Sequence, residues 1–192
     1  RKLTRFVRFC SNEIKERVFR AGREDNADFV ITEIGGTVGD IEGLPFLEAI
    51  RQVKKHVGRN DCLYIHVTLV PFVTGAGELK TKPTQHSVKE LRSLGIQPDI
   101  LICRSAQPIP QDMCEKMAMF CDVDADAVFQ NLTARSIYEV PVLLEKQGLD
   151  EVVLRKLDVD VTNHPLDMTE WHDMVERMLK VYDRKVTLGV VG

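Results

Sequence analysis

The chain has 192 residues, of which 44% are hydrophobic and 29% are charged. This composition is typical of a globular protein that is long enough for one substantial core. A net charge of -3 gives no reason to expect nucleic-acid binding, and no apolar run approaches the roughly 20 residues that span a membrane. The five cysteines form no CxxC pair and no metal-binding spacing with histidine, which suits a reducing cytoplasm.

The first ten residues alternate basic and apolar side chains without a helical period, so an edge strand or a disordered lead-in is expected there. From Ser11 the pattern changes. The spacing of Ile14, Val18 and Phe19 predicts a helix that begins at Ser11 or Asn12 and ends near Gly22.

A short, β-branched apolar run at Phe29–Glu33 predicts a buried strand. Glycines and acids follow it: Gly35, Gly36, Gly39, Asp40 and Glu42. At the carboxyl end of a parallel sheet, Glu33 would project toward a ligand, and a carboxylate beside a nucleotide favours a hard cation such as Mg2+. A helix-capping acid after a plain turn explains the same pattern equally well.

Apolar runs and amphipathic stretches alternate along the rest of the chain. Strands are predicted at 62–71, 99–105 and 128–129, and helices at 44–53, 88–94, 111–121, 136–148, 149–157 and 170–182. The nearly continuous apolar run at 62–71 suits a strand that is buried on both faces, and His66 within it is expected to be a core histidine. The alternation predicts an α/β fold with a largely parallel sheet flanked by helices.

A cluster of cationic and polar residues lies directly before the predicted helix at 88–94. Its members are Lys80, Thr81, Lys82, Pro83, Thr84 and Gln85. Ammonium groups, hydroxyl groups and the free N–H groups of a helix start can together bind a polyphosphate. A solvated basic loop is the alternative, and the position after a buried strand favours the phosphate site.

The polar stretch 158–165 predicts a connector, and the apolar residues at 185–192 predict a strand that opens a further unit. The sequence contains no GxxxxGK[ST] loop, no GxGxxG motif and no Ser/His/Asp set at recognisable spacing. The residues alone therefore predict no catalytic nucleophile.

Three long segments resemble the CTP synthase family: 33–52, 78–91 and 95–105. The similarity extends from about residue 12 to the end of the chain. The resemblance implies a P-loop NTPase-like amidoligase domain, akin to dethiobiotin synthetase, over residues 1–157. It also implies a connector and helix at 158–184 and the first strand of a glutaminase domain at 185–192.

The family makes CTP from UTP, ATP and ammonia taken from glutamine. The uracil O4 is first phosphorylated, and ammonia then displaces the phosphate. The resemblance thus implies a cytoplasmic, C–N bond-forming ligase that is a homotetramer when intact, with Mg2+ and ATP as cofactors and CTP as feedback inhibitor.

The resemblance also assigns residues. It implies that Glu33 binds Mg2+, that Asp40, Ile41 and Glu42 contact the pyrimidine nucleotide, and that Lys80, Thr81, Lys82, Pro83, Thr84, Gln85 and Lys116 bind UTP or CTP. Leu132, Thr133 and Ala134 fall where the family contacts ATP, although the charged residue often found there is absent. The family's phosphate-binding Gly/Ser-Lys-Gly loop and second Mg2+ carboxylate lie upstream of the matched region and are absent from this sequence. Residues 1–192 are therefore expected to be an internal fragment that is inactive alone.

Two alternatives remain open. The chain could be a non-catalytic module that binds UTP or CTP and assembles at nucleotide-containing subunit contacts. It could also be another amide-forming ligase of the dethiobiotin synthetase group, although the Lys-Thr-Lys-Pro-Thr-Gln stretch and the glutaminase-like tail argue against that reading.

Overall fold

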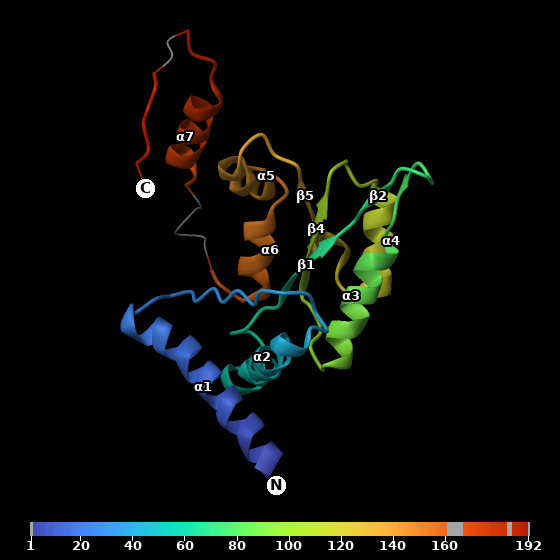
Figure 1. Cartoon of the computed structure of the whole chain (residues 1–192), viewed down its shortest axis with the longest axis vertical. Helices are drawn as coiled ribbons and strands as arrows, with labels where there is room; N and C mark the ends of the chain where they lie inside the picture. Colours follow the sequence, from blue (N-terminus) through green and yellow to red (C-terminus); the bar gives the residue numbers. More distant parts are fainter. Residues whose placement is uncertain (1, 161–166, 184–185, 192) are drawn as a thin grey trace.

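The structure is a computed structural model that describes residues 2–160, 167–183 and 186–191. Its centre is a three-stranded parallel sheet in the order β1-β4-β5, which is visible edge-on in the middle of Figure 1. The strands are β1 (Ile65–Leu69), β4 (Ile100–Ser105) and β5 (Val128–Leu132). This arrangement confirms the predicted α/β class and parallel sheet.

Helices α3 (Lys82–Ser93) and α4 (Gln111–Cys121) cover one face of the sheet. They connect β1 to β4 and β4 to β5, as parallel pairing requires. The core on this face consists of Val70, Val88, Leu101, Cys103, Ile109, Cys114, Met117 and Cys121. Helix α4 has the predicted bounds, whereas α3 begins at Lys82, six residues before the predicted range 88–94. In both helices the apolar residues recur at helical spacing and pack on this one face.

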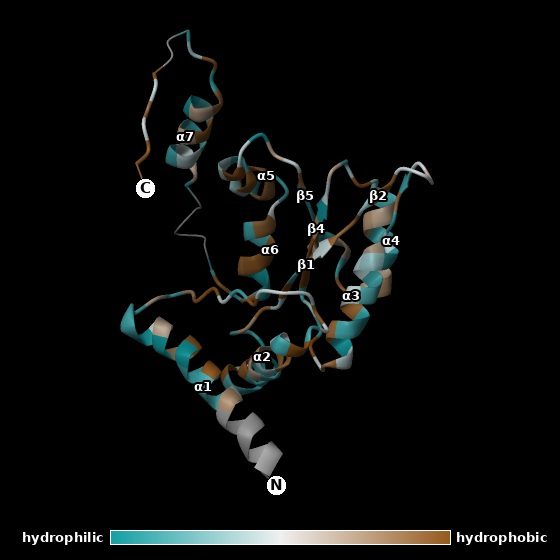
Figure 2. Ribbon diagram, viewed as in Figure 1, coloured by the Kyte–Doolittle hydropathy of each residue, from teal (hydrophilic) through white to brown (hydrophobic). Residues whose placement is uncertain are grey.

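The opposite face is covered by α5 (Val140–Glu145) and α6 (Leu149–Lys156), which carry much hydrophobic colour in Figure 2. The short helices η2 (Ala125–Ala127) and η3 (Ile137–Glu139) flank β5 and α5. Ile100, Ala127, Phe129 and Val152 form the core here. Pro141 lies in the first turn of α5, within the predicted helix 136–148. A residue at that position has no helical hydrogen-bond partner for its backbone nitrogen, so a proline is tolerated there.

Strand β1 is an edge strand, and the prediction that it is buried on both faces is wrong. Its residues Ile65 and Val67 pair in register with Ile100 and Ile102, so they share the α5/α6 face. Val67 is 62% exposed, whereas Ile100 is fully buried, since α5 and α6 pack over β4 and β5. Apolar composition predicted the strand but could not predict which faces are covered.

The N-terminal region is a long helix, α1 (Lys2–Glu24), packed against α2 (Leu44–Val57). The predicted lead-in over the first ten residues is wrong, and Ser11 lies inside the helix rather than at its cap. Lys15 Nζ donates to Gln52 Oε1 of α2 at 2.6 Å. Contacts with α2 therefore stabilise the helix at Lys15, and the helix extends back to Lys2 through a segment whose own sequence lacks a helical period.

Residues Phe29–Glu33 form no strand in the structure, which corrects the prediction of a buried strand. Ile31 is 95% exposed, and the segment runs as an extended connection between α1 and η1 (Ile41–Gly43). A strand needs a hydrogen-bonding neighbour, and β1 pairs with β4 alone among the described strands. The β-branched composition predicted the extended backbone, but it could not predict that no neighbouring strand pairs with this segment.

Helix α7 (Thr169–Leu179) packs against the region of α5. Trp171 Nε1 donates to the Tyr138 carbonyl at 2.9 Å, and His172 Nε2 lies 2.6 Å from Glu145 Oε2. The cap of α7 is Met168 rather than the expected Thr169. Most of the predicted connector lies outside the described residues, and residues 186–191 carry no strand. The predicted domain boundaries stay predictions.

Among the described residues, no helix combines the length and apolar character needed to cross a membrane.

A half-buried ion pair ties α2 to the sheet. Lys54 Nζ donates to both carboxylate oxygens of Asp99 at 2.9 and 2.8 Å, and the Tyr64 backbone N–H donates to the same carboxylate at 2.8 Å. The Tyr64 hydroxyl donates to the Ile50 carbonyl at 2.6 Å, and burial raises the pKa of this phenol, which keeps it protonated. These contacts fix α2 against the amino-terminal ends of β1 and β4.

We predict that Asp99→Ala lowers the free energy of unfolding by about 2 kcal/mol, because it leaves the Lys54 ammonium and the Tyr64 N–H unpaired in a half-buried position. Urea denaturation followed by circular dichroism measures the change. The exposed pair Glu13–Arg17 provides the control, and Glu13→Ala is expected to change stability by no more than about 0.5 kcal/mol. Equal effects of the two variants would contradict this account.

Candidate functional site

The chain leaves the sheet at the carboxyl end of β1 through a short hairpin. Strand β2 (Phe72–Val73) pairs with β3 (Glu78–Leu79), and the Lys80 N–H donates to the Pro71 carbonyl at 2.9 Å. Helix α3 then begins at Lys82. The hairpin therefore returns the chain to the sheet edge and places Lys80 and Lys82 beside the end of β1.

The predicted phosphate-binding residues divide into an outer and an inner group. Lys82 and Pro83 are exposed, and Lys80 and Gln85 are partly exposed. Thr81 and Thr84 are buried. Lys82 to Gln85 form the first turn of α3 rather than the loop before it. Pro83 carries no N–H and the Gln85 N–H donates to the Thr81 carbonyl at 3.1 Å, so Lys82 and Thr84 hold the N–H groups of this turn that an anion could meet. The outer group can meet an anion, whereas the two threonines face the interior.

Thr84 and His66 hold α3 on β1. The Thr84 hydroxyl lies 3.0 Å from Thr68 Oγ1 and donates to the Leu69 carbonyl at 3.2 Å, and His66 Nε2 lies 2.9 Å from Ser87 Oγ. Burial lowers the pKa of His66, so the ring is neutral at pH 7. The expected core role of His66 is confirmed, and these contacts fix the direction in which Lys80 and Lys82 point.

Lys116, on α4, lies within electrostatic range of the hairpin. The Glu78 carboxylate contacts the Lys80 ammonium, and its pKa is lowered first by that hydrogen bond and further by the positive charge of Lys116. Lys116, which is 36 positions from Lys80 in the sequence, thus adds a weaker charge effect at the same carboxylate.

The acidic loop lies at the other end of the sheet, which corrects the expectation that Glu33 projects at the carboxyl edge. Ile34 packs with Leu91 and Ile96, where α3 ends and β4 is about to begin. Gly39 adjoins Glu90 on the last turns of α3. Lys82 and Glu90 are separated by about 12 Å along the helix axis. The structure does not bring Glu33 together with the phosphate-binding residues of the same chain.

The loop itself is a structured turn. Asp40 Oδ2 accepts the Thr37 N–H at 3.0 Å, and Gly36 and Gly39 have φ angles of 88° and 104°, which only glycine adopts readily. Ile41 is 82% exposed, and Glu42 is also exposed. The Asp40 carboxylate therefore closes the turn before η1 and makes no side-chain cap hydrogen bond to that helix, while Ile41 and Glu42 stay available for contacts outside this chain.

Comparison with known proteins now decides the family. The family described as CTP synthase N-terminus matches residues 2–159. The chain belongs to this family. Proteins named CTP synthase from Bacillus cytotoxicus, Carboxydothermus hydrogenoformans and Geobacillus kaustophilus are 57%, 59% and 61% identical over 182 residues, which is 95% of this chain. The chain spans 34% of the length of each of these relatives.

The CTP synthase residues expected to contact ATP lie at the carboxyl end of β5. Arg104, at the end of the neighbouring β4, donates to the Asn131 carbonyl at 3.2 Å and to Thr133 Oγ1 at 3.1 Å. The guanidinium group thus holds the Asn131 carbonyl and the Thr133 side chain at the end of β5. Arg104 is absent from the predicted site, although a charged side chain at the end of an apolar strand is a usable sequence signal.

The described residues contain no group of three or more His, Cys, Asp or Glu side chains placed to hold a metal ion. Glu33 offers a single carboxylate. Because Mg2+ is often held by one or two carboxylates together with substrate phosphates and water, this residue fits an ion that arrives with a nucleotide. The assignment of Glu33 as a Mg2+ ligand stays a prediction.

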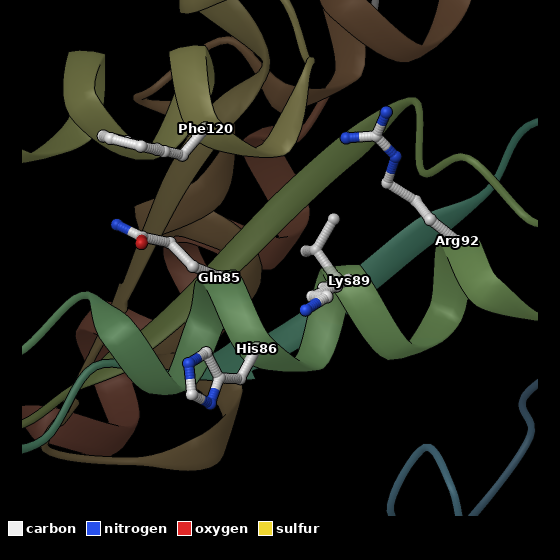
Figure 3. A pocket seen from close by; sticks show the side chains of 6 residues that line it. Gln85, His86, Lys89, Arg92 and Phe120 are labelled. Carbon is white, nitrogen blue, oxygen red and sulfur yellow. The ribbon is translucent and has the colours of Figure 1, made fainter.

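A cavity of about 270 Å³ lies between α3 and α4. Figure 3 shows Gln85, His86, Lys89 and Arg92 along α3, with Phe120 opposite them on α4. Phe120 was expected in the core but is 54% exposed, because Cys121 and Met117 fill the interior in its place. The cavity has basic and aromatic walls and adjoins Gln85, the last of the predicted phosphate-binding residues.

We predict that Thr84→Val lowers the free energy of unfolding by about 1–2 kcal/mol, since the isosteric valine loses the hydrogen bonds to Thr68 and Leu69. Thr84→Ser keeps the hydroxyl and is the matched variant, with a smaller expected loss. Thermal and urea unfolding of both variants measure the difference. A valine variant as stable as the serine variant would show that the hydroxyl does not hold α3 in place.

Proposed function

We propose that the intact protein is a CTP synthase that aminates UTP to CTP, using ATP and ammonia derived from glutamine. The observation that carries the proposal is the Lys80–Gln85 segment, which lies at the start of α3 beside the carboxyl edge of a parallel sheet. Ligands of such sheets bind at this edge. Membership of the CTP synthase family supports a nucleotide triphosphate as the ligand.

In this proposal the triphosphate of UTP or CTP lies against the outer residues of the segment. Lys80 and Lys82 supply charge, the first turn of α3 supplies N–H groups, and Lys116 approaches from α4. A charge-assisted hydrogen bond contributes about 1.5–3 kcal/mol, so several of them account for tight binding of a polyanion. Thr81 and Thr84 act indirectly, by holding the backbone of this segment against β1.

The pyrimidine contact of Asp40, Ile41 and Glu42 is proposed to come from a second copy of the chain. In one chain these residues adjoin the last turns of α3, about 12 Å along the helix axis from Lys82. A site shared between subunits would bring both groups to one nucleotide and suits the proposed homotetramer. CTP would bind the same phosphate residues as UTP, which is the basis proposed for feedback inhibition.

The proposed reaction begins with transfer of the γ-phosphate of ATP to the uracil O4. Ammonia then adds at C4, and inorganic phosphate leaves with the O4 oxygen. Leu132 to Ala134 and Arg104 are proposed to contact ATP at the end of β5, and Glu33 would contribute one carboxylate to a nucleotide-bound Mg2+. The ammonia would come from a glutaminase domain that residues 185–192 introduce.

We predict that Lys82→Ala weakens binding of CTP about 10- to 100-fold, because it removes one charge-assisted contact to the phosphates. Isothermal titration calorimetry with CTP and Mg2+ measures the affinity. Lys55→Ala, which removes an exposed lysine from α2, is the control and should bind like the wild type. Unchanged affinity in the Lys82 variant would remove this segment from the site.

We also predict that residues 1–192 alone produce no CTP from UTP, ATP and ammonia, because the sequence holds no GxxxxGK[ST] loop to bind the ATP phosphates. Chromatographic detection of CTP measures turnover. Binding of CTP without turnover would favour the second candidate for this chain, a UTP- or CTP-binding module that assembles. Measurable turnover would refute the prediction and assign the complete ligase site to these residues.

A further inference from the structure

Glu78 stands within the proposed phosphate site but has no role in it so far. It pairs with Val73 across the β2–β3 hairpin, two residues before Lys80. The Glu78 Oε1 atom contacts Lys80 Nζ, while 58% of the Glu78 side chain and 41% of the Lys80 side chain remain exposed. The carboxylate is therefore both paired with a site lysine and open to exchange with a ligand in solution.

A second site lysine acts on the same carboxylate. The pKa of Glu78 is lowered mainly by the hydrogen bond and the charge of Lys80, with a further contribution from Lys116 on α4. The ion pair of Glu78 is with Lys80, and Lys116 adds a weaker charge effect from α4. A carboxylate paired with a site ammonium group occupies the position that a phosphate oxygen would take.

We propose that Glu78 is an internal counter-ion of the site, which pairs with Lys80 in the ligand-free protein and is displaced when a polyphosphate binds. The inference rests on the proposed function, since it assumes that Lys80 meets the phosphates. A ligand with a single negative charge does no more than replace the carboxylate, whereas a triphosphate supplies several negative charges. Glu78 therefore favours polyphosphates over singly charged anions and reduces the affinity for every anion.

The test compares wild type with Glu78→Gln, which keeps the side-chain shape and removes the charge. Titration of inorganic tripolyphosphate without divalent cations is expected to give about 3- to 10-fold tighter binding to the variant, because an exposed ion pair is lost and a nearby repulsive charge is removed. Glu13→Gln makes the same change in an equally exposed pair on α1 and should not alter binding.

A second measurement follows the ion pair without a ligand. Brief acetylation followed by mass spectrometry reports the accessibility of each lysine. Lys80 should be labelled faster in Glu78→Gln than in wild type, while Lys89, an exposed lysine on α3, provides the internal reference. Bound tripolyphosphate should protect Lys80 in both proteins, because it takes the place of the carboxylate.

The outcomes separate the two proposals. If wild type binds neither CTP nor tripolyphosphate, the proposed function fails and the counter-ion role fails with it. If wild type binds both, but Glu78→Gln binds tripolyphosphate equally or more weakly, the counter-ion role is overturned while the proposed function stands. Tighter binding together with faster labelling of Lys80 supports the role.

Discussion

The position of α3 on β1 is the constraint on which the rest of this structure depends. A threonine pair and a neutral histidine–serine pair cross the interface between the helix and the strand. Both pairs are buried or half-buried, where an unmade hydrogen bond is costly, so they hold one register of the helix against the strand. The first turn of α3 consequently lies at the carboxyl edge of the sheet, with its lysines outward.

The same helix separates the two groups of predicted nucleotide residues. Its first turn carries the cations, and its last turns adjoin the glycine-containing loop with Asp40 and Glu42. In one chain the two groups stand about 12 Å apart along the helix axis. A second copy of the chain is the proposed source of the pyrimidine contacts for a nucleotide bound at the first turn.

The local pattern of apolar and polar residues predicted those helices and strands that bury a continuous stripe of apolar side chains. Helix α4 begins and ends at the predicted residues, and β4 differs by one residue, because Leu101 and Cys103 alternate with Ile100 and Ile102 between two covered faces. The prediction failed at Phe29–Glu33 and at the amino terminus. Strand formation depends on a partner elsewhere in the chain, and α1 depends on packing against α2.

The Lys80–Gln85 segment was predictable as a candidate phosphate site, since cations and hydroxyl groups gather there before a helix start, and a solvated basic loop was the alternative. The structure decided which of its residues face a ligand. Thr84 is buried and bonded to β1, and Glu78, which had no predicted role, contacts Lys80. Arg104 likewise reaches Thr133 only because β4 and β5 pair in parallel register.

The sequence by itself determined the fold class, most helices and the chemical character of the phosphate-binding segment, because periodicity and local charge are properties of neighbouring residues. Tertiary structure alone decided that β1 is an edge strand, that Glu33 and Lys82 lie at opposite ends of the sheet, and that Arg104 contacts Thr133. These relations join residues far apart in the chain, and they are set by packing that no local pattern encodes.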